Sequence, residues 1–101
     1  MATRCIWLNH EFQICTYGGS WNPVPGLYIF CAVAGTGRWR ALYVGQTDSF
    51  SESFRDHPVW PEAVRRGATH VHAFFSDDNV ERFALEQALV YAFKPPLNES
   101  L

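Results

Sequence analysis

Short apolar runs, rich in β-branched and aromatic residues, recur along the chain between glycine, proline and polar breaks. The runs at 27–33 and 41–44 lie on either side of a Gly-rich segment, residues 34–37, and predict two strands of one antiparallel hairpin. Residues 69–75 predict a third strand. Residues 4–16 alternate loosely around Asn9 and His10, which predicts a two-stranded ribbon added to the edge of the main sheet.

The polar segment after the second strand predicts two short helices. Asp48 and Ser49 are polar residues suited to capping a helix over 50–56, and Pro58 would end it. Pro61 suits the first position of the next helix, and Gly67 suits the residue just after its end.

A longer helix is predicted near the end of the chain. Asp78 and Glu81 have the spacing of a capping box, and the helix then continues to about residue 93, where two prolines stop it. Together the elements predict an α+β fold, a small antiparallel three-stranded sheet flanked by helices with an added N-terminal β-hairpin. We divide the chain into an N-terminal ribbon extension, residues 1–25, and one compact domain, residues 26–101.

Length and composition narrow the class of protein. The chain has 101 residues, of which 48% are hydrophobic, so one domain with its own core is expected. Residues 1–4 lack the pattern of a signal peptide, and no apolar run is long enough to span a bilayer, so we expect a soluble cytoplasmic protein. The three cysteines, Cys5, Cys15 and Cys31, are an odd number without metal-site spacing, and we interpret them as small buried residues.

The charge balance does not by itself indicate a nucleic-acid-binding protein. The formal net charge is -2, whereas proteins that bind nucleic acid usually have a basic surface. Arg38 and Arg40 flank Trp39, an arrangement that can contact a strand of nucleic acid. Arg65 and Arg66 are expected at a helix end, where they would compensate the helix dipole.

Glu86 is the residue most indicative of chemistry when it is considered without relatives. Helical spacing places it beside Phe83, Leu89, Val90 and Phe93, so its carboxylate lies on an apolar stripe. Such a carboxylate is costly unless it is paired, hydrogen-bonded or bound to a cation. A glutamate at the helix edge that reaches water is one interpretation, and an oxygen ligand for a divalent ion such as Mg²⁺ is the other.

Five elements in order resemble the GIY-YIG nuclease family. The paired motif is matched by Gly-Leu-Tyr at 26–28 and Tyr-Val-Gly at 43–45, and Gly45 marks a place where a ligand approaches the backbone. A Gln-Thr-Asp run follows at 46–48, Glu86 matches the metal-binding glutamate, and the closing segment ends at Asn98. The resemblance covers residues 26–98, most of the chain.

The resemblance implies hydrolysis of phosphodiester bonds in nucleic acid, with DNA as the favoured substrate. Tyr28 would deprotonate or orient the attacking water, and Glu86 would hold Mg²⁺ or Mn²⁺, which polarises the phosphate. Tyr43 would shape the pocket, and Asn98 would brace the site by hydrogen bonds. His57 would assist proton transfer or position water, although a surface histidine is an equally weighted alternative.

One position departs from the family pattern. The family has an essential arginine about eight residues after the motif glycine, where this chain has Ser53, which carries no charge for a phosphate. Arg55 is the nearest arginine, but on a helix it would point about 200° away from Ser53. Arg55 therefore serves the site only if the helix is distorted, and otherwise is a solvated residue that pairs with Glu52 or Asp56.

Three functions are compatible with these features. The first is a metal-dependent endonuclease in which Arg55, or an arginine of the 38–40 segment, supplies the missing charge. The second is a nuclease-derived module that has lost turnover and binds nucleic acid or a protein partner. The third, a purely structural protein, leaves the ordered polar residues unexplained. An unpaired strand edge on the ribbon could also support a homodimer.

Overall fold

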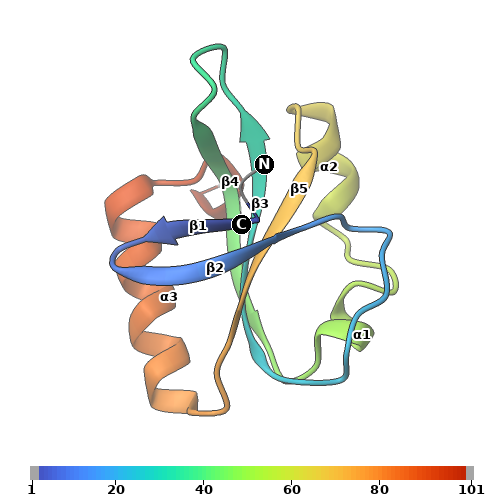
Figure 1. The fold of residues 1–101 in the computed structure, drawn as a ribbon, viewed down its shortest axis with the longest axis vertical. Coiled ribbons are helices and arrows are strands. Elements are labelled where there is room, and N and C mark those ends of the chain that lie inside the picture. The colour runs from blue at the N-terminus through green and yellow to red at the C-terminus, as the bar shows by residue number, and fades with distance from the viewer. Residues whose placement is uncertain (1–2, 100–101) are drawn as a thin grey trace.

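The computed structural model describes residues 3–99 and contains one antiparallel sheet of five strands with four helices (Figure 1). The order across the sheet is β1-β2-β5-β3-β4, so β3 lies between its hairpin partner and the last strand of the sequence. The strands are β1 (Arg4–Trp7), β2 (His10–Cys15), β3 (Gly26–Val33), β4 (Trp39–Thr47) and β5 (His70–Phe75). The helices are α1 (Phe50–Ser53), α2 (Trp60–Arg65), α3 (Asn79–Phe93) and α4 (Pro96–Glu99).

The predicted α+β class is confirmed, but the sheet has five strands and not three. The N-terminal ribbon is continuous with it, because β2 pairs with β5 along the register Gln13↔Ala73. Without that pairing, β5 would leave its outer backbone groups unpaired, and β2 satisfies them. Residues 1–2 and 100–101, at the ends of the two expected segments, lie outside the described part of the chain.

Local sequence explains the turns and most helix ends. The β1–β2 turn uses Leu8 and Asn9, both with positive φ, as a two-residue hairpin of this type requires. Helix α3 begins at the expected cap, where the Asp78 side chain accepts from two backbone amides, and it ends at residue 93 as predicted. Gly67 has a φ of 101°, which allows the chain to turn after α2.

The first helix is shorter than the sequence predicts. Helix α1 ends at Ser53 and not at residue 56. The next residue, Phe54, leaves helical geometry and buries its ring against Trp21 and Tyr28. The chain then extends to His57, which is also buried. Burial of these two rings therefore outweighs continuation of a helix that is too short to be stable alone.

The two faces of β3 belong to two separate cores. Tyr28, Phe30 and Ala32 face the core that contains residues of α1, α2 and α4. Leu27, Ile29 and Cys31 face the other core, which α3 covers with Leu85 and Leu89. Both motif tyrosines pack with the first core, so this face of the sheet carries the candidate chemistry.

Only one of the three cysteines is fully buried as the sequence predicts. Cys31 is buried, Cys5 and Cys15 are partly buried, and all three are free thiols. Within residues 3–99, none of the helices combines the length and the apolar character needed to cross a bilayer.

Candidate functional site

A hydrogen bond between Tyr28 and His57 forms the centre of the candidate site. Tyr28 comes from the middle of β3, and His57 from the loop between α1 and α2. The Tyr28 Oη atom lies 2.7 Å from His57 Nε2. Both residues are buried, with 3% and 7% exposure, so the structure excludes the interpretation of His57 as a surface histidine.

The partners of His57 fix which ring nitrogen carries the proton. Its Nδ1 atom accepts a hydrogen bond from the Val59 backbone amide at 3.1 Å, so the neutral ring holds its proton on Nε2. Burial lowers the pKa of His57, which keeps the ring neutral at pH 7. The Nε2–H group therefore donates to Tyr28 Oη, and the Tyr28 proton is directed to another acceptor.

Gly45 is required by the position of the Tyr28 ring. The two residues face each other across β3 and β4. A Cβ atom at position 45 would lie 2.4 Å from Tyr28 Oη and 2.5 Å from Cζ, well inside van der Waals contact. The motif glycine thus makes room for the phenol of the motif tyrosine.

Tyr43 and Glu86 approach the same phenol from the edge of the sheet. Burial raises the pKa of Tyr28, and the neighbouring Tyr43 and Glu86 raise it further. Burial also raises the pKa of Tyr43, and Glu86 adds to this effect. The rings of Tyr43 and His57 are 5.7 Å apart between centroids. The structure therefore brings Tyr28, Tyr43 and His57 into contact, and Glu86 lies close enough to raise the pKa of both phenols.

The orientation of Glu86 depends on Gln46 and on a residue that the sequence analysis missed, Arg82. Arg82 Nε donates to Gln46 Oε1 at 3.1 Å. Because a guanidinium only donates, the amide oxygen of Gln46 faces Arg82 and its NH₂ group is left for Glu86. That hydrogen bond lowers the pKa of Glu86 against the larger, opposite effect of burial.

Arg82 is structural and not available to a phosphate. It is 3% exposed, and its remaining groups bond to the Ser76 carbonyl at 2.9 Å, to Asp48 at 3.0 Å and to Asn79. The sequence signal was its position four residues before Glu86, on the same helical face as Leu85 and Leu89.

Asn98 holds the outer strand of the site. Its Oδ1 atom accepts from the Val44 amide at 2.8 Å, and its Nδ2 atom donates to the Val44 carbonyl at 2.9 Å. The side chain thus pairs with β4 as another strand would. This is the bracing role that the sequence predicts, placed one residue from both Tyr43 and Gly45.

Ser53, at the position of the family arginine, faces the site, and Arg55 does not. A hydrogen bond with the Ser53 side chain lowers the pKa of Tyr28. Arg55 is exposed and lines a separate hollow with Tyr17 and Trp21. The idea that Arg55 substitutes for the missing charge has no geometric support in this arrangement.

The basic segment of the β3–β4 hairpin also differs from its expected form. The Trp39 ring packs against His70 and His72, with centroids 5.2 Å and 4.5 Å away, so it is not an open aromatic between two arginines. Arg38 and Arg40 are exposed, and neither has an ion-pair partner within residues 3–99. Arg40 lines a small hollow with Lys94 beside β4, three residues from Tyr43.

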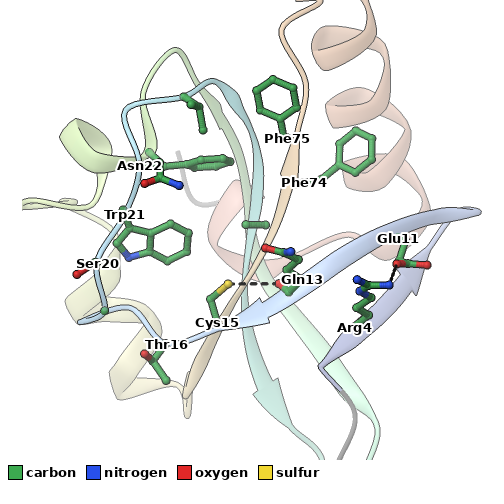
Figure 2. Close-up of a pocket in the computed structure, with 14 residues that line it drawn as sticks. Arg4, Glu11, Gln13, Cys15, Thr16, Ser20, Trp21, Asn22, Phe74 and Phe75 are labelled. Carbon is green, nitrogen blue, oxygen red and sulfur yellow. Dashed lines mark hydrogen bonds and ion pairs between the residues drawn. The ribbon is translucent and has the colours of Figure 1, made fainter.

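A larger hollow lies on the same face of the sheet, beside Phe50 of α1 and away from Tyr28. It has a volume of about 770 Å³ and is bounded by β2, β5 and the segment that follows β2 (Figure 2). None of Tyr28, Tyr43 and Glu86 lines it. The chemistry and this hollow are therefore neighbouring features and not one site.

Comparison with known proteins adds no relative to this description. No protein-family model matches the chain, and neither a curated protein nor a solved structure matches it.

Proposed function

We propose that the protein is a GIY-YIG-type, metal-dependent endonuclease-like protein that hydrolyses phosphodiester bonds in nucleic acid, with DNA as the first substrate to test. The observation that carries the proposal is the cluster of Tyr28, His57 and Tyr43, with the phenol 2.7 Å from the imidazole and with Glu86 near enough to raise the pKa of both tyrosines. Two hydroxyls, a neutral imidazole and a carboxylate are the groups that hydrolysis of an ester requires.

Tyr28 is assigned to positioning the attacking water. Its raised pKa keeps the phenol protonated at pH 7, so a free phenolate is not the base. The Nε2–H group of His57 donates to the phenol oxygen, and the Ser53 hydroxyl also hydrogen-bonds to it, so the phenol's own proton is the group left to orient a water. His57 thus orients Tyr28, and Tyr28 orients the water.

Glu86 fits a divalent cation as a single carboxylate ligand. It is half-buried, its pKa is raised by burial, and Gln46 fixes its direction. Mg²⁺ commonly binds through one or two carboxylates and keeps several waters, so residues 3–99 need no cluster of three acidic, cysteine or histidine ligands, and they contain none. A bound Mg²⁺ or Mn²⁺ would polarise the phosphate and stabilise the leaving oxygen.

Within residues 3–99, the site lacks a free positive charge that could stabilise a reacting phosphate. Arg82 is fully engaged, Arg55 lies elsewhere, and position 53 is a serine. Positive charge at a transferring phosphoryl group commonly contributes several kcal/mol to the transition state, so turnover should be slow. Arg38 and Arg40 remain as contacts for the phosphates of a bound strand.

The same observation favours a second candidate, a module that binds nucleic acid without cutting it. A site that keeps its hydroxyls, its carboxylate and its bracing asparagine but lacks the guanidinium retains recognition better than catalysis. The two candidates differ in one measurable respect, which is whether the natural chain cleaves DNA at all.

A supercoiled-plasmid nicking assay with Mg²⁺ or Mn²⁺ separates them. We expect slow nicking by the natural chain and none by Tyr28→Phe or Glu86→Ala. Ser53→Arg should increase the rate about 100-fold, the usual effect of one well-placed charged donor. The control is Tyr91→Phe, since Tyr91 is an exposed tyrosine on α3 that makes no ring contact or hydrogen bond with Tyr28, Tyr43 or His57 within residues 3–99.

Each result decides between the candidates. Nicking that survives Tyr28→Phe would exclude the proposed site as its source. If only Ser53→Arg nicks the plasmid, the natural protein is the binding module. If neither the natural chain nor Ser53→Arg nicks DNA or RNA, the nuclease proposal is wrong.

A further inference from the structure

The larger hollow beside α1 combines an aromatic wall with polar groups that have no partner. Figure 2 shows Trp21 and Asn22 at one side of it, Gln13 on the floor strand β2, and Phe75 at the end of β5. The ion pair between Arg4 and Glu11 lies at the opposite end. At about 770 Å³, the hollow has ample room for a base of a nucleotide.

The Trp21 ring is fixed before any ligand arrives. Its Nε1 atom donates to the Tyr17 carbonyl at 2.9 Å, and its ring packs edge-on against Phe54 with centroids 4.5 Å apart. Phe75, by contrast, is 59% exposed, at the end of a strand whose central residues are buried. One rigid and one exposed aromatic ring therefore border the same space, as in sites where bases stack on side chains.

The polar groups of the hollow match the edges of bases. Neither the Gln13 nor the Asn22 side-chain amide has a hydrogen-bond partner within residues 3–99. An amide offers one acceptor and two donors, the combination that pairs with the edge of an unpaired base. A purely apolar ligand, or the apolar face of a peptide, would cover both amides and leave them without hydrogen-bond partners.

The cation needed for a phosphate lies on the other side of Trp21. Arg55 lines a second hollow, of about 350 Å³, that shares Gly19 and Trp21 with the first. Arg55 has no ion-pair partner in the described part of the chain. A nucleotide with its base beside Trp21 could therefore place its phosphate toward Arg55.

We propose that this hollow binds an unpaired base of a single-stranded nucleic acid, with the adjoining phosphate at Arg55. The inference rests on the proposed function, because it assigns the nucleic-acid substrate a single-stranded segment next to the cleaved bond. Bases inside a duplex cannot enter such a hollow without leaving their stack. The site thus gives Arg55 a role in substrate choice, although the position of Arg55 removes it from the chemistry.

The test is fluorescence anisotropy with a labelled DNA strand of about 12 nucleotides, within the usual range of single-strand sites, and with its duplex. EDTA is present so that no cleavage occurs. The natural chain should bind the single strand at least tenfold more tightly than the duplex. Phe75→Ser should weaken single-strand binding about tenfold, as expected for one lost base–aromatic contact. Arg55→Ala should weaken it and reduce the salt slope by roughly 0.7.

Matched controls exist for both variants. Phe83→Ser removes a phenylalanine that is also 59% exposed, but on α3 and the other face of the sheet. Arg65→Ala removes an exposed arginine of α2 that pairs with Glu62. Both controls should bind like the natural chain. Gln13→Ala, at an exposed position of β2, repeats the test of the hollow should Phe75→Ser fail to fold by circular dichroism.

The inference is wrong if duplex and single strand bind equally, if no single-strand binding is detected, or if Phe75→Ser binds like Phe83→Ser. It is also wrong if Phe75→Ser dissociates a dimer in sedimentation, since a second copy would then occupy the hollow. The proposal of cleavage and the proposal of single-strand binding can be disproved independently. Nicking that is insensitive to Phe75→Ser and Arg55→Ala leaves the proposed function intact, whereas Phe75-dependent binding without nicking leaves only the hollow.

Discussion

Each face of the sheet contains one buried histidine, and the two differ in what their ring nitrogens meet. His57 accepts from the Val59 amide through Nδ1 and meets the Tyr28 hydroxyl through Nε2. His72, on β5, accepts from the Trp7 indole through Nδ1 at 2.9 Å, and its Nε2 atom has no partner in the described residues. By the same reasoning as for His57, the unpartnered nitrogen is the one that carries the proton.

The surroundings explain why only one of them is a candidate for chemistry. His72 is fully buried between aromatic rings, with Trp39 4.5 Å away between centroids. Burial, and secondarily the charge of His70, lowers its pKa to about 4. His57 shares its space with a phenol and a carboxylate. Burial alone thus does not make a histidine functional, and a neighbour that can exchange a hydrogen bond with substrate or water is also needed.

Replacing each histidine in turn should separate effects on stability from effects on activity. The largest loss of stability is expected at His72. His72→Ala leaves a cavity between Trp7 and Trp39 and leaves the Trp7 indole without an acceptor. We expect a loss of about 3 kcal/mol in the free energy of unfolding, measured with urea. His57→Ala should instead lower the rate of DNA nicking per folded molecule.

The control for His72 is His70→Ala, because His70 lies two residues away on the same strand but is only partly buried. It should cost much less stability. Nicking per folded molecule should be the same for His72→Ala as for the natural chain. If His72→Ala reduced it as much as His57→Ala, the distinction between the two faces would be lost.

Acid should destabilise the protein mainly through His72. Its pKa is about 4 in the folded chain and near 6.5 when the histidine is unfolded, so protonation favours the unfolded state. The loss begins as the pH falls below 6.5 and reaches about 3 kcal/mol below pH 4. His57 acts in the same direction, and Glu86, whose pKa is raised, acts in the opposite one.

Urea unfolding at pH 7 and pH 4.5 measures this effect. His72→Gln has no titrating ring, so the difference in stability between the two pH values should be smaller in that variant by most of this amount. His70→Gln should keep most of the acid response, because burial is the larger cause of the lowered His72 pKa and the charge of His70 the smaller one. An equal acid response in His72→Gln and His70→Gln would show that the loss arises from other groups.

A single methyl group at position 45 should disturb the face of the sheet that carries the candidate site without touching the other face. In Gly45→Ala the new Cβ atom would meet Tyr28 Oη at 2.4 Å, so the phenol or β4 must shift. Overpacking of this kind costs about 2 kcal/mol, and it should also break the Tyr28–His57 hydrogen bond. We expect lower stability in urea and no nicking. The hydrogen bond from Trp7 to His72 should persist, with its indole proton resonance unchanged by NMR.

Much of the fold could be predicted because the signals were local. The hairpin of β3 and β4, the cap at Asp78 and the turn at Gly67 follow from residue types within a few positions of each other. The pairing of β2 with β5 joins residues about sixty positions apart, such as Gln13 and Ala73. No local pattern encodes such a pairing, so the sequence predicted a ribbon added to the edge of a three-stranded sheet but not the strand with which it pairs.

The residues of the candidate site likewise include some that local sequence predicts and some that it does not. Tyr28, Tyr43 and Glu86 could be selected from their motifs, and their role in a site stays a prediction. The role of Arg82 in directing Gln46 could not be predicted, since it depends on one side chain reaching from α3 to β4. The contact of Tyr17 with the His57 backbone amide could not be predicted either, because Tyr17 lies before the motifs in the N-terminal segment. Such residues are identified by contacts and not by spacing.

Tyr17 offers the smallest and most selective change on the face of the sheet that carries the candidate site. Its hydroxyl accepts from the His57 backbone amide at 3.0 Å, and its ring stacks on Trp60 with centroids 4.3 Å apart. Tyr17→Phe keeps the stack and removes the acceptor, which should cost about 1 kcal/mol and lower the melting temperature by about 4–8 °C. Because His57 then loses one of its supports, nicking should decrease more than in Tyr91→Phe, at a temperature where both variants are fully folded. Equal rates in these two variants would mean that the N-terminal segment stabilises the His57 loop without orienting its ring.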